Sequence, residues 1–201
     1  PVGAATVRDI DGEGVDEIVV FGVNADGKVR AQLRDALTGK QVAAHFFDPD
    51  FPPVLVTAIP SMNNNVTDEL VVLGVDDGGS IRAEVRDSKT GKQLATVPYD
   101  KKFPPLLMSY VAHPDGAALA VLGENSAGKR QSRTKLLAAN ETVGVVPYPP
   151  SLATDNLLSL DDADGDGSPE LLLSGELESG RIRIITKDVV TGTELYRKTL
   201  P

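Results

Sequence analysis

The residues best suited to chemistry form an acidic stretch at 162–170, here named loop four. It reads Asp162-Ala163-Asp164-Gly165-Asp166-Gly167-Ser168-Pro169-Glu170. Side-chain oxygens recur at positions 1, 3, 5 and 9, and position 7 offers a backbone carbonyl. Calcium takes six to eight oxygen ligands at about 2.3–2.6 Å, and glycines at positions 4 and 6 allow the sharp bend. The spacing predicts a calcium site formed by Asp162, Asp164, Asp166, the carbonyl of Ser168, and Glu170.

A second acidic stretch, loop one at residues 9–17, has the same spacing. It reads Asp9-Ile10-Asp11-Gly12-Glu13-Gly14-Val15-Asp16-Glu17. The carboxylates of such a loop would repel one another strongly without a cation. The predicted ligands are Asp9, Asp11, Glu13, the carbonyl of Val15, and Glu17. For both loops, the competing interpretation is a solvated Asp-Gly hairpin that holds no ion.

Two further stretches occupy corresponding places with less charge. Loop two, residues 61–69, keeps the spacing but carries Ser61, Asn63 and Asn65 where loop four has aspartates. Its asparagines are expected to hydrogen-bond the turn, so any ion there would be weak. Loop three is only His113-Pro114-Asp115-Gly116, and we expect no ion in it.

These loops belong to an internal repeat. Residues 16–23, Asp-Glu-Ile-Val-Val-Phe-Gly-Val, return as 68–75, Asp-Glu-Leu-Val-Val-Leu-Gly-Val, and Phe51-Pro52-Pro53 returns at 103–105. The fourth copy matches the first at three times nearly the same period. Copy three is the most divergent. The predicted copies are residues 1–50, 51–102, 103–147 and 148–201, together one domain.

Each copy has the pattern of four β-strands. The second strand is a continuous apolar run such as 18–23, which predicts burial on both faces. The third strand alternates, with Val29, Ala31 and Leu33 on one face. No helical periodicity is sustained. The fold class predicted is all-β: a β-propeller of four repeats of four antiparallel strands, as a closed four-bladed ring or a segment of a larger propeller. A solenoid of hairpins is the alternative.

An acidic loop followed by an apolar strand and a glycine resembles the FG-GAP repeat of integrin α-chain propellers and its bacterial VCBS-type relatives. The resemblance covers nearly the whole chain. It implies that the loop joins the first two strands of a blade and binds calcium through the positions already named. It also implies a bacterial extracellular or cell-surface protein. One departure is that the family's last ligand is usually aspartate, whereas this chain has Glu17 and Glu170. The resemblance therefore makes Asp16 an alternative to Glu17.

Other classes of function find little support in the sequence. A net charge of −9 opposes nucleic-acid binding, and no apolar run approaches the ~20 residues of a membrane-inserted helix. His45 and His113 lie in no nucleophile motif. The Asp-x-x-Thr-Gly turns that begin at Asp35, Asp87 and Asp188 are interpreted as hairpin caps. The chain is therefore predicted not to be an enzyme.

Aromatic residues gather near the connections between copies. Phe51, Phe103 and Tyr148 each precede a Pro-Pro pair and are candidate partner-binding residues, able to stack on a sugar ring or anchor a protein. The alternative is that these rings pack one blade against the next.

Three functions fit these observations. The first is a calcium-stabilised interaction or adhesion scaffold that binds a glycan or a protein. The second is part of a polysaccharide-degrading, lyase-type propeller enzyme, which would need a Lys, Arg or Tyr base near the ion. The third is a spacer within a longer chain.

Overall fold

The computed structural model describes residues 2–63, 65–150 and 152–201, and it confirms an all-β chain of four antiparallel, four-stranded sheets. Sheet one contains β1 (Gly3–Val7), β2 (Glu17–Val23), β3 (Val29–Asp35) and β4 (Gln41–Phe46). Sheet two contains β5 (Pro53–Ile59), β6 (Glu69–Val75), β7 (Ile81–Asp87) and β8 (Gln93–Tyr99). Sheet three contains β9 (Pro105–His113), β10 (Gly116–Glu124), β11 (Arg130–Leu136) and β12 (Thr142–Tyr148). Sheet four contains β13 (Leu152–Leu160), β14 (Glu170–Leu177), β15 (Ile182–Asp188) and β16 (Glu194–Thr199).

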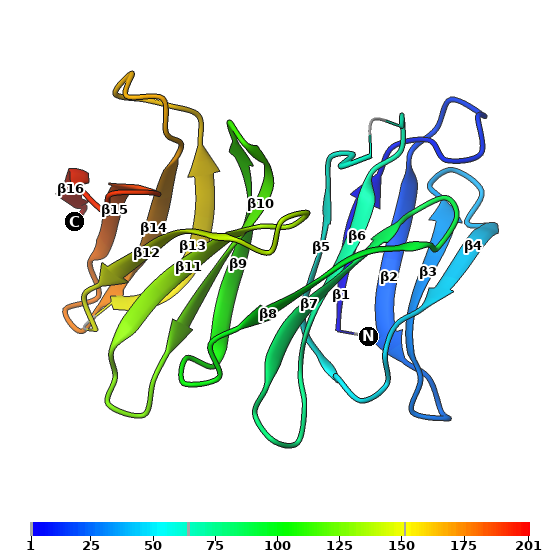
Figure 1. Ribbon diagram of the computed structural model, residues 1–201, viewed down its shortest axis with the longest axis horizontal. Helices are drawn as coiled ribbons and strands as arrows, with labels where there is room; N and C mark the ends of the chain where they lie inside the picture. The colour runs from blue at the N-terminus through cyan, green and yellow to red at the C-terminus, as the bar shows by residue number, and fades with distance from the viewer. Residues whose placement is uncertain (1, 64, 151) are drawn as a thin grey trace. The chain divides into compact units, whose positions relative to one another are not determined.

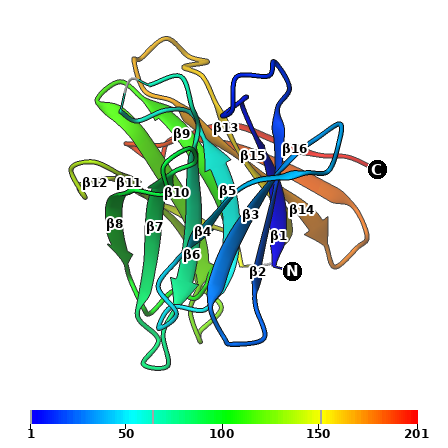
Figure 2. The same ribbon diagram turned by 90° about the vertical axis from the view of Figure 1, so that its right-hand side faces the viewer.

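In every sheet, each strand pairs with the next one along the chain (Figures 1 and 2). The chain divides into two compact units, Pro1–Tyr99 with sheets one and two and Asp100–Pro201 with sheets three and four. Each expected copy therefore forms one sheet. One boundary differs, because Tyr148 ends β12 of sheet three instead of beginning copy four.

Each unit has its own hydrophobic core between its two sheets. In the first unit, Val19 and Phe21 of β2 and Leu33 of β3 share a buried cluster with Leu70 and Val72 of β6. In the second unit, the buried cluster joins residues of sheets three and four, among them Leu122, Val146, Leu171, Leu173 and Ile185. The strict alternation of β3, in which Val29, Ala31 and Leu33 are buried, follows from this one-sided packing.

The expectation that the second strand is buried on both faces holds for β6 but is wrong for β2. Leu70 through Leu73 are at most 3% exposed, whereas Ile18 and Val20 are 41% and 37% exposed. The equivalent residues Leu70 and Val72 pack in the core shared with sheet one, but Ile18 and Val20 lie on the opposite face of sheet one from its core residues. A continuous apolar run allows a strand to be buried on both faces, but it does not determine whether a second sheet packs against that strand.

The Phe-Pro-Pro connection passes directly over the glycine of the second strand. A Cβ atom added at Gly74 would lie 2.4 Å from the carbonyl oxygen of Phe51, and one added at Gly123 would lie 2.4 Å from that of Phe103. Such distances are far inside van der Waals contact. The repeated glycine of β6 and β10 is therefore required by the connection that crosses it.

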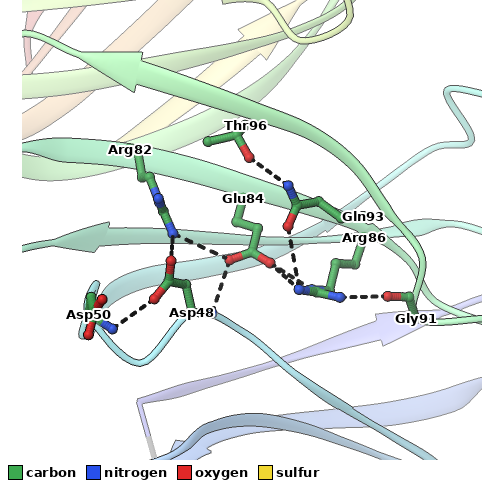
Figure 3. Close-up of polar contacts among 8 residues, drawn as sticks. All are labelled: Asp48, Asp50, Arg82, Glu84, Arg86, Gly91, Gln93 and Thr96. Atoms are coloured by element: carbon green, nitrogen blue, oxygen red, sulfur yellow. Dashed lines mark hydrogen bonds and ion pairs between the residues drawn. The ribbon is translucent and has the colours of Figure 1, made fainter.

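In sheet two, a charged cluster holds this connection in place (Figure 3). Arg82 of β7 pairs with Asp48, and its guanidinium lies 3.6 Å from the centroid of the Phe51 ring. Glu84 accepts a hydrogen bond from the backbone N–H of Asp48 (3.1 Å) and pairs with Arg86 (2.5 Å). The charged side chains of β7 thus pair with one another and with Asp48, and they hold residues 48–51 against the strand.

We expect Gly74→Ala to lower the free energy of unfolding by about 1–3 kcal/mol, because the new methyl group forces backbone to move in a packed region. Urea unfolding measures the change. Gly78→Ala is the matched control, since its Cβ would approach only the Asp76 side chain, at 3.3 Å. Equal effects of the two substitutions would contradict this account of Gly74.

Candidate metal centres

Loops one and four each connect the first and second strands of a sheet, β1 to β2 and β13 to β14. The turn between the third and fourth strands lies at the same end, because antiparallel strands reverse direction at every turn. The connections that carry Phe51 and Phe103 lie at the opposite end of their sheets. Loop one therefore shares its end of sheet one with the turn after Asp35, and loop four shares its end of sheet four with the turn after Asp188.

In loop one, Asp9 organises the turn. Its carboxylate accepts backbone N–H groups from Gly12 and Gly14, each at 2.7 Å, and both glycines have positive φ. Led by the bond from Gly14, these hydrogen bonds hold the pKa of Asp9 below its usual value. Asp9, Asp11 and Glu17 each place a carboxylate oxygen within 4.8 Å of the others. The fifth-position Glu13 is exposed and lies outside this group.

Loop four repeats this arrangement. Asp162 accepts the backbone N–H groups of Gly165 (2.6 Å) and Gly167 (2.9 Å). Here the residues whose carboxylate oxygens lie within 4.8 Å of one another are Asp162, Asp164 and Asp166, all exposed. The predicted seventh-position residues, Val15 in loop one and Ser168 in loop four, are half-buried.

The ninth position of both loops is a fully buried glutamate. Glu17 and Glu170 are each 0% exposed, and one oxygen of each accepts the backbone N–H of the loop's second residue at 3.0 Å. The other oxygen, Oε1, is buried without a hydrogen-bond partner. Burial raises the pKa of both groups, and the neighbouring aspartates of the loop add to the effect.

The donor set fits a hard cation. A buried carboxylate oxygen without a partner calls for a ligand or a proton, and in loop one the residue that carries it, Glu17, converges with Asp9 and Asp11. Asp16, the alternative to Glu17, is exposed and not in the group. In loop four, Glu170 lies outside the group of three aspartates.

In loop two, side-chain amide groups hydrogen-bond the aspartate of the third strand. The Nδ2 atoms of Asn63 and Asn65 donate to Oδ2 of Asp87 at 3.2 and 2.6 Å, as expected of asparagines that bond the turn. Its ninth residue, Glu69, is 0% exposed, and burial raises the pKa of Glu69 to about 7. Asn64 lies outside the described residues.

Loop three is a tight turn between β9 and β10. Asp115 is exposed, and its carboxylate lies 3.7 Å from Nδ1 of His113. Among the described residues of this turn, no group of acidic side chains converges.

Sequence reasoning missed a pairing that runs through three sheets. Glu17, Glu69 and Glu170 lie directly across from Asp35, Asp87 and Asp188 on the third strand. Those aspartates do cap their turns, as predicted; Asp87, for example, accepts the Thr90 amide at 2.7 Å. The available signal was the constant spacing between the glutamate and the aspartate in all three copies.

The aromatic candidates lie in packed surroundings. Phe51 and Phe103 are half-buried over Gly74 and Gly123, and Tyr148 is 5% exposed. This environment favours a packing role for all three. Partner binding by these residues stays a prediction.

No family model and no curated protein matches the sequence. Solved structures do. The BBS1N structure in complex with ARL6DN matches 98% of this chain and 54% of its own, at 12% identity and a TM-score of 0.62. The Dos1 propeller matches 97% of this chain and 46% of its own, at 11% identity and a TM-score of 0.60. Kuenenia stuttgartiensis hydrazine synthase matches 93% of this chain and 53% of its own, at 12% identity and a TM-score of 0.56. The chain thus has a β-propeller fold and spans about half the length of these structures. Among its described residues, no helix is long or apolar enough to cross a membrane.

Because burial raises the pKa of Glu69, Glu69→Gln should change the free energy of unfolding by an amount that depends on pH. The measurement is thermal unfolding in the presence of a chelator. Wild-type Glu69 keeps its proton in the folded state up to about pH 7, but loses it near 4.5 when unfolded, so its contribution to stability falls as pH rises between these values. Glutamine mimics the protonated form. We expect the variant to be more stable than wild type at pH 8 by roughly 1–3 kcal/mol and equal to it near pH 4.5. The same difference at both pH values would contradict this.

Proposed function

We propose that this chain is a calcium-stabilised β-propeller module that serves as an interaction or adhesion scaffold, with no catalytic step of its own. The observation that carries the proposal is the buried, unpartnered Oε1 of Glu17 in a loop where Glu17, Asp9 and Asp11 converge within 4.8 Å. The resemblance to FG-GAP and VCBS-type repeats supports calcium, and it supports a bacterial extracellular or cell-surface location.

Calcium fits the loops better than other metals. The candidate donors are carboxylate and carbonyl oxygens, and the chain has no cysteine. Thiolate and imidazole ligands are those that favour zinc and copper. Magnesium demands near-octahedral geometry and keeps several waters, whereas calcium accepts the irregular set of oxygens that a nine-residue loop offers.

A stabilising role follows from where the loops lie. Each loop ties the first strand of its sheet to the buried glutamate that begins the second strand. A cation there would cancel carboxylate repulsion and fix the turn. Arg8, which precedes loop one, is held by Asp68 of loop two (Nε to Oδ1, 2.8 Å), so it does not supply the free base that a lyase needs.

The scaffold role rests on the fold. Propellers present loops at both ends of rigid sheets, and one structural neighbour is seen in complex with a protein, ARL6DN. We propose a protein or a glycan as the partner of this module.

Removal of calcium should lower the melting temperature. A ligand that binds only the folded state stabilises it by about 2.7 kcal/mol per site at one hundred times its Kd, which corresponds to about 5 °C or more for a chain of this size. The measurement is thermal unfolding in calcium and in excess chelator, with calorimetric titration of calcium. Two sites per chain are expected.

Asp164→Ala should remove the stabilisation supplied by loop four, because Asp164 belongs to its converging group. Asp115→Ala is the matched control from loop three and should leave the response to calcium unchanged. If wild type melts at one temperature in both solutions and shows no heat of binding, the acidic loops are solvated turns and the proposal fails.

A further inference from the structure

Strand β14 begins with Glu170, directly across from Asp188 at the end of β15. The two residues are 0% and 1% exposed. Oδ1 of Asp188 accepts the backbone N–H groups of Val190 (3.1 Å) and Thr191 (2.5 Å). Oδ2 of Asp188 and Oε1 of Glu170 are buried without hydrogen-bond partners, and in the described part of the chain neither residue pairs with a lysine, arginine or histidine.

Burial of this pair of acids lowers the stability of the folded state unless another group compensates their charge and bonds their free oxygens. Like charges directly across a sheet repel, and buried carboxylate oxygens without partners are costly. Burial raises the pKa of Glu170 first of all, and the charges of Asp164, Asp162 and Asp188 raise it further. The buried pair and the acidic loop therefore form one region of negative charge.

Sheet two shows that the loop can reach the third-strand aspartate. The third and fifth residues of loop two, Asn63 and Asn65, both donate to Oδ2 of Asp87. In loop four the third and fifth residues are Asp164 and Asp166, which in their ionised form have no N–H or O–H to donate. The equivalent oxygen of Asp188 is the one left without a partner. A cation bound between the carboxylates of sheet four would bond the free oxygen of Asp188, as the two amides bond Asp87 in sheet two.

Sheet three shows that the loop and the buried pair are lost together. Where the acidic loop is replaced by a tight turn, the position across from Leu136 is Ala118. Both are apolar, and both are buried at 7% and 0% exposure. The two acids thus occur in the sheets that carry an acidic or amide loop and are replaced in the sheet that carries neither.

We propose that Asp188 is a further residue of the cation site in loop four, supplying from the third strand a carboxylate whose charge and free oxygen strengthen cation binding. Asp35 has the same role for loop one: it lies across from Glu17, is 6% exposed, and has one oxygen engaged by the Thr38 amide at 2.6 Å. This inference rests on the proposed calcium binding and extends the site beyond the loop.

The test is Asp188→Asn in an Asp11→Ala background, where only loop four is left to titrate. Asparagine keeps the oxygen that accepts the turn amides and removes the charge. We expect the Kd for calcium, measured by calorimetry, to rise about tenfold or more. In chelator, the melting temperature of the variant should equal or exceed that of its parent, because repulsion with Glu170 is relieved. Asp87→Asn in the same background is the control and should leave the Kd unchanged.

The outcomes separate the two claims. If the Asp11→Ala parent and wild type bind no calcium, the proposed function fails and this inference fails with it. If the parent binds calcium and Asp188→Asn binds it with the same Kd, the proposed function stands and the inference is overturned. An equal loss of melting temperature in calcium and in chelator would also overturn it, because it would make Asp188 only a turn cap.

Discussion

A glutamate with no solvent exposure begins the second strand in three of the four sheets, and an aspartate lies directly across from it each time. A buried pair of carboxylates is unfavourable unless a proton, a hydrogen-bond donor or a cation compensates it. We infer that the loop before each pair supplies the groups that compensate the buried carboxylates.

The four sheets differ at these two positions. Sheet two uses neutral groups: Asn63 and Asn65 donate to Asp87, and the pKa of Glu69 near 7 favours a bound proton. Sheet three has apolar residues instead, Ala118 across from Leu136. Sheets one and four keep the acids and add more carboxylates in the loop. Without a cation, that addition would make the repulsion worse, and this is the strongest physical reason to place calcium there.

The repeat and the strands were predictable from the sequence because they depend on local patterns. The recurrence of Asp-Glu before an apolar run and of Phe-Pro-Pro after a fourth strand identified the copies, and alternation identified the strands. Of the four acidic side chains predicted for each loop, Asp9, Asp11 and Glu17 converge in loop one, and Asp162, Asp164 and Asp166 converge in loop four. Glu13 and Glu170 lie outside these groups, and their ligand role stays a prediction.

What was not predictable depends on register and on neighbours. Ile18 and Val20 are exposed because they lie on the face of sheet one opposite to the core that it shares with sheet two, and an apolar run does not encode which face meets a neighbour. The pairing of Glu170 with Asp188 needs the register of β14 on β15, so Asp188 was interpreted only as a turn cap. The sequence left Phe51 open between a partner contact and packing between blades, because its position against Gly74 and Arg82 depends on contacts that only the fold brings together.

We propose that a cation compensates the buried carboxylates of sheets one and four. The most direct measurement is the anomalous difference density of crystals grown with calcium, collected at long wavelength. We expect one peak in loop one and one in loop four, each contacting Oε1 of Glu17 or Glu170, and no peak in loop three. Well-ordered loops one and four that contain no anomalous peak, with those glutamate oxygens bonded to water or to a proton, would contradict it.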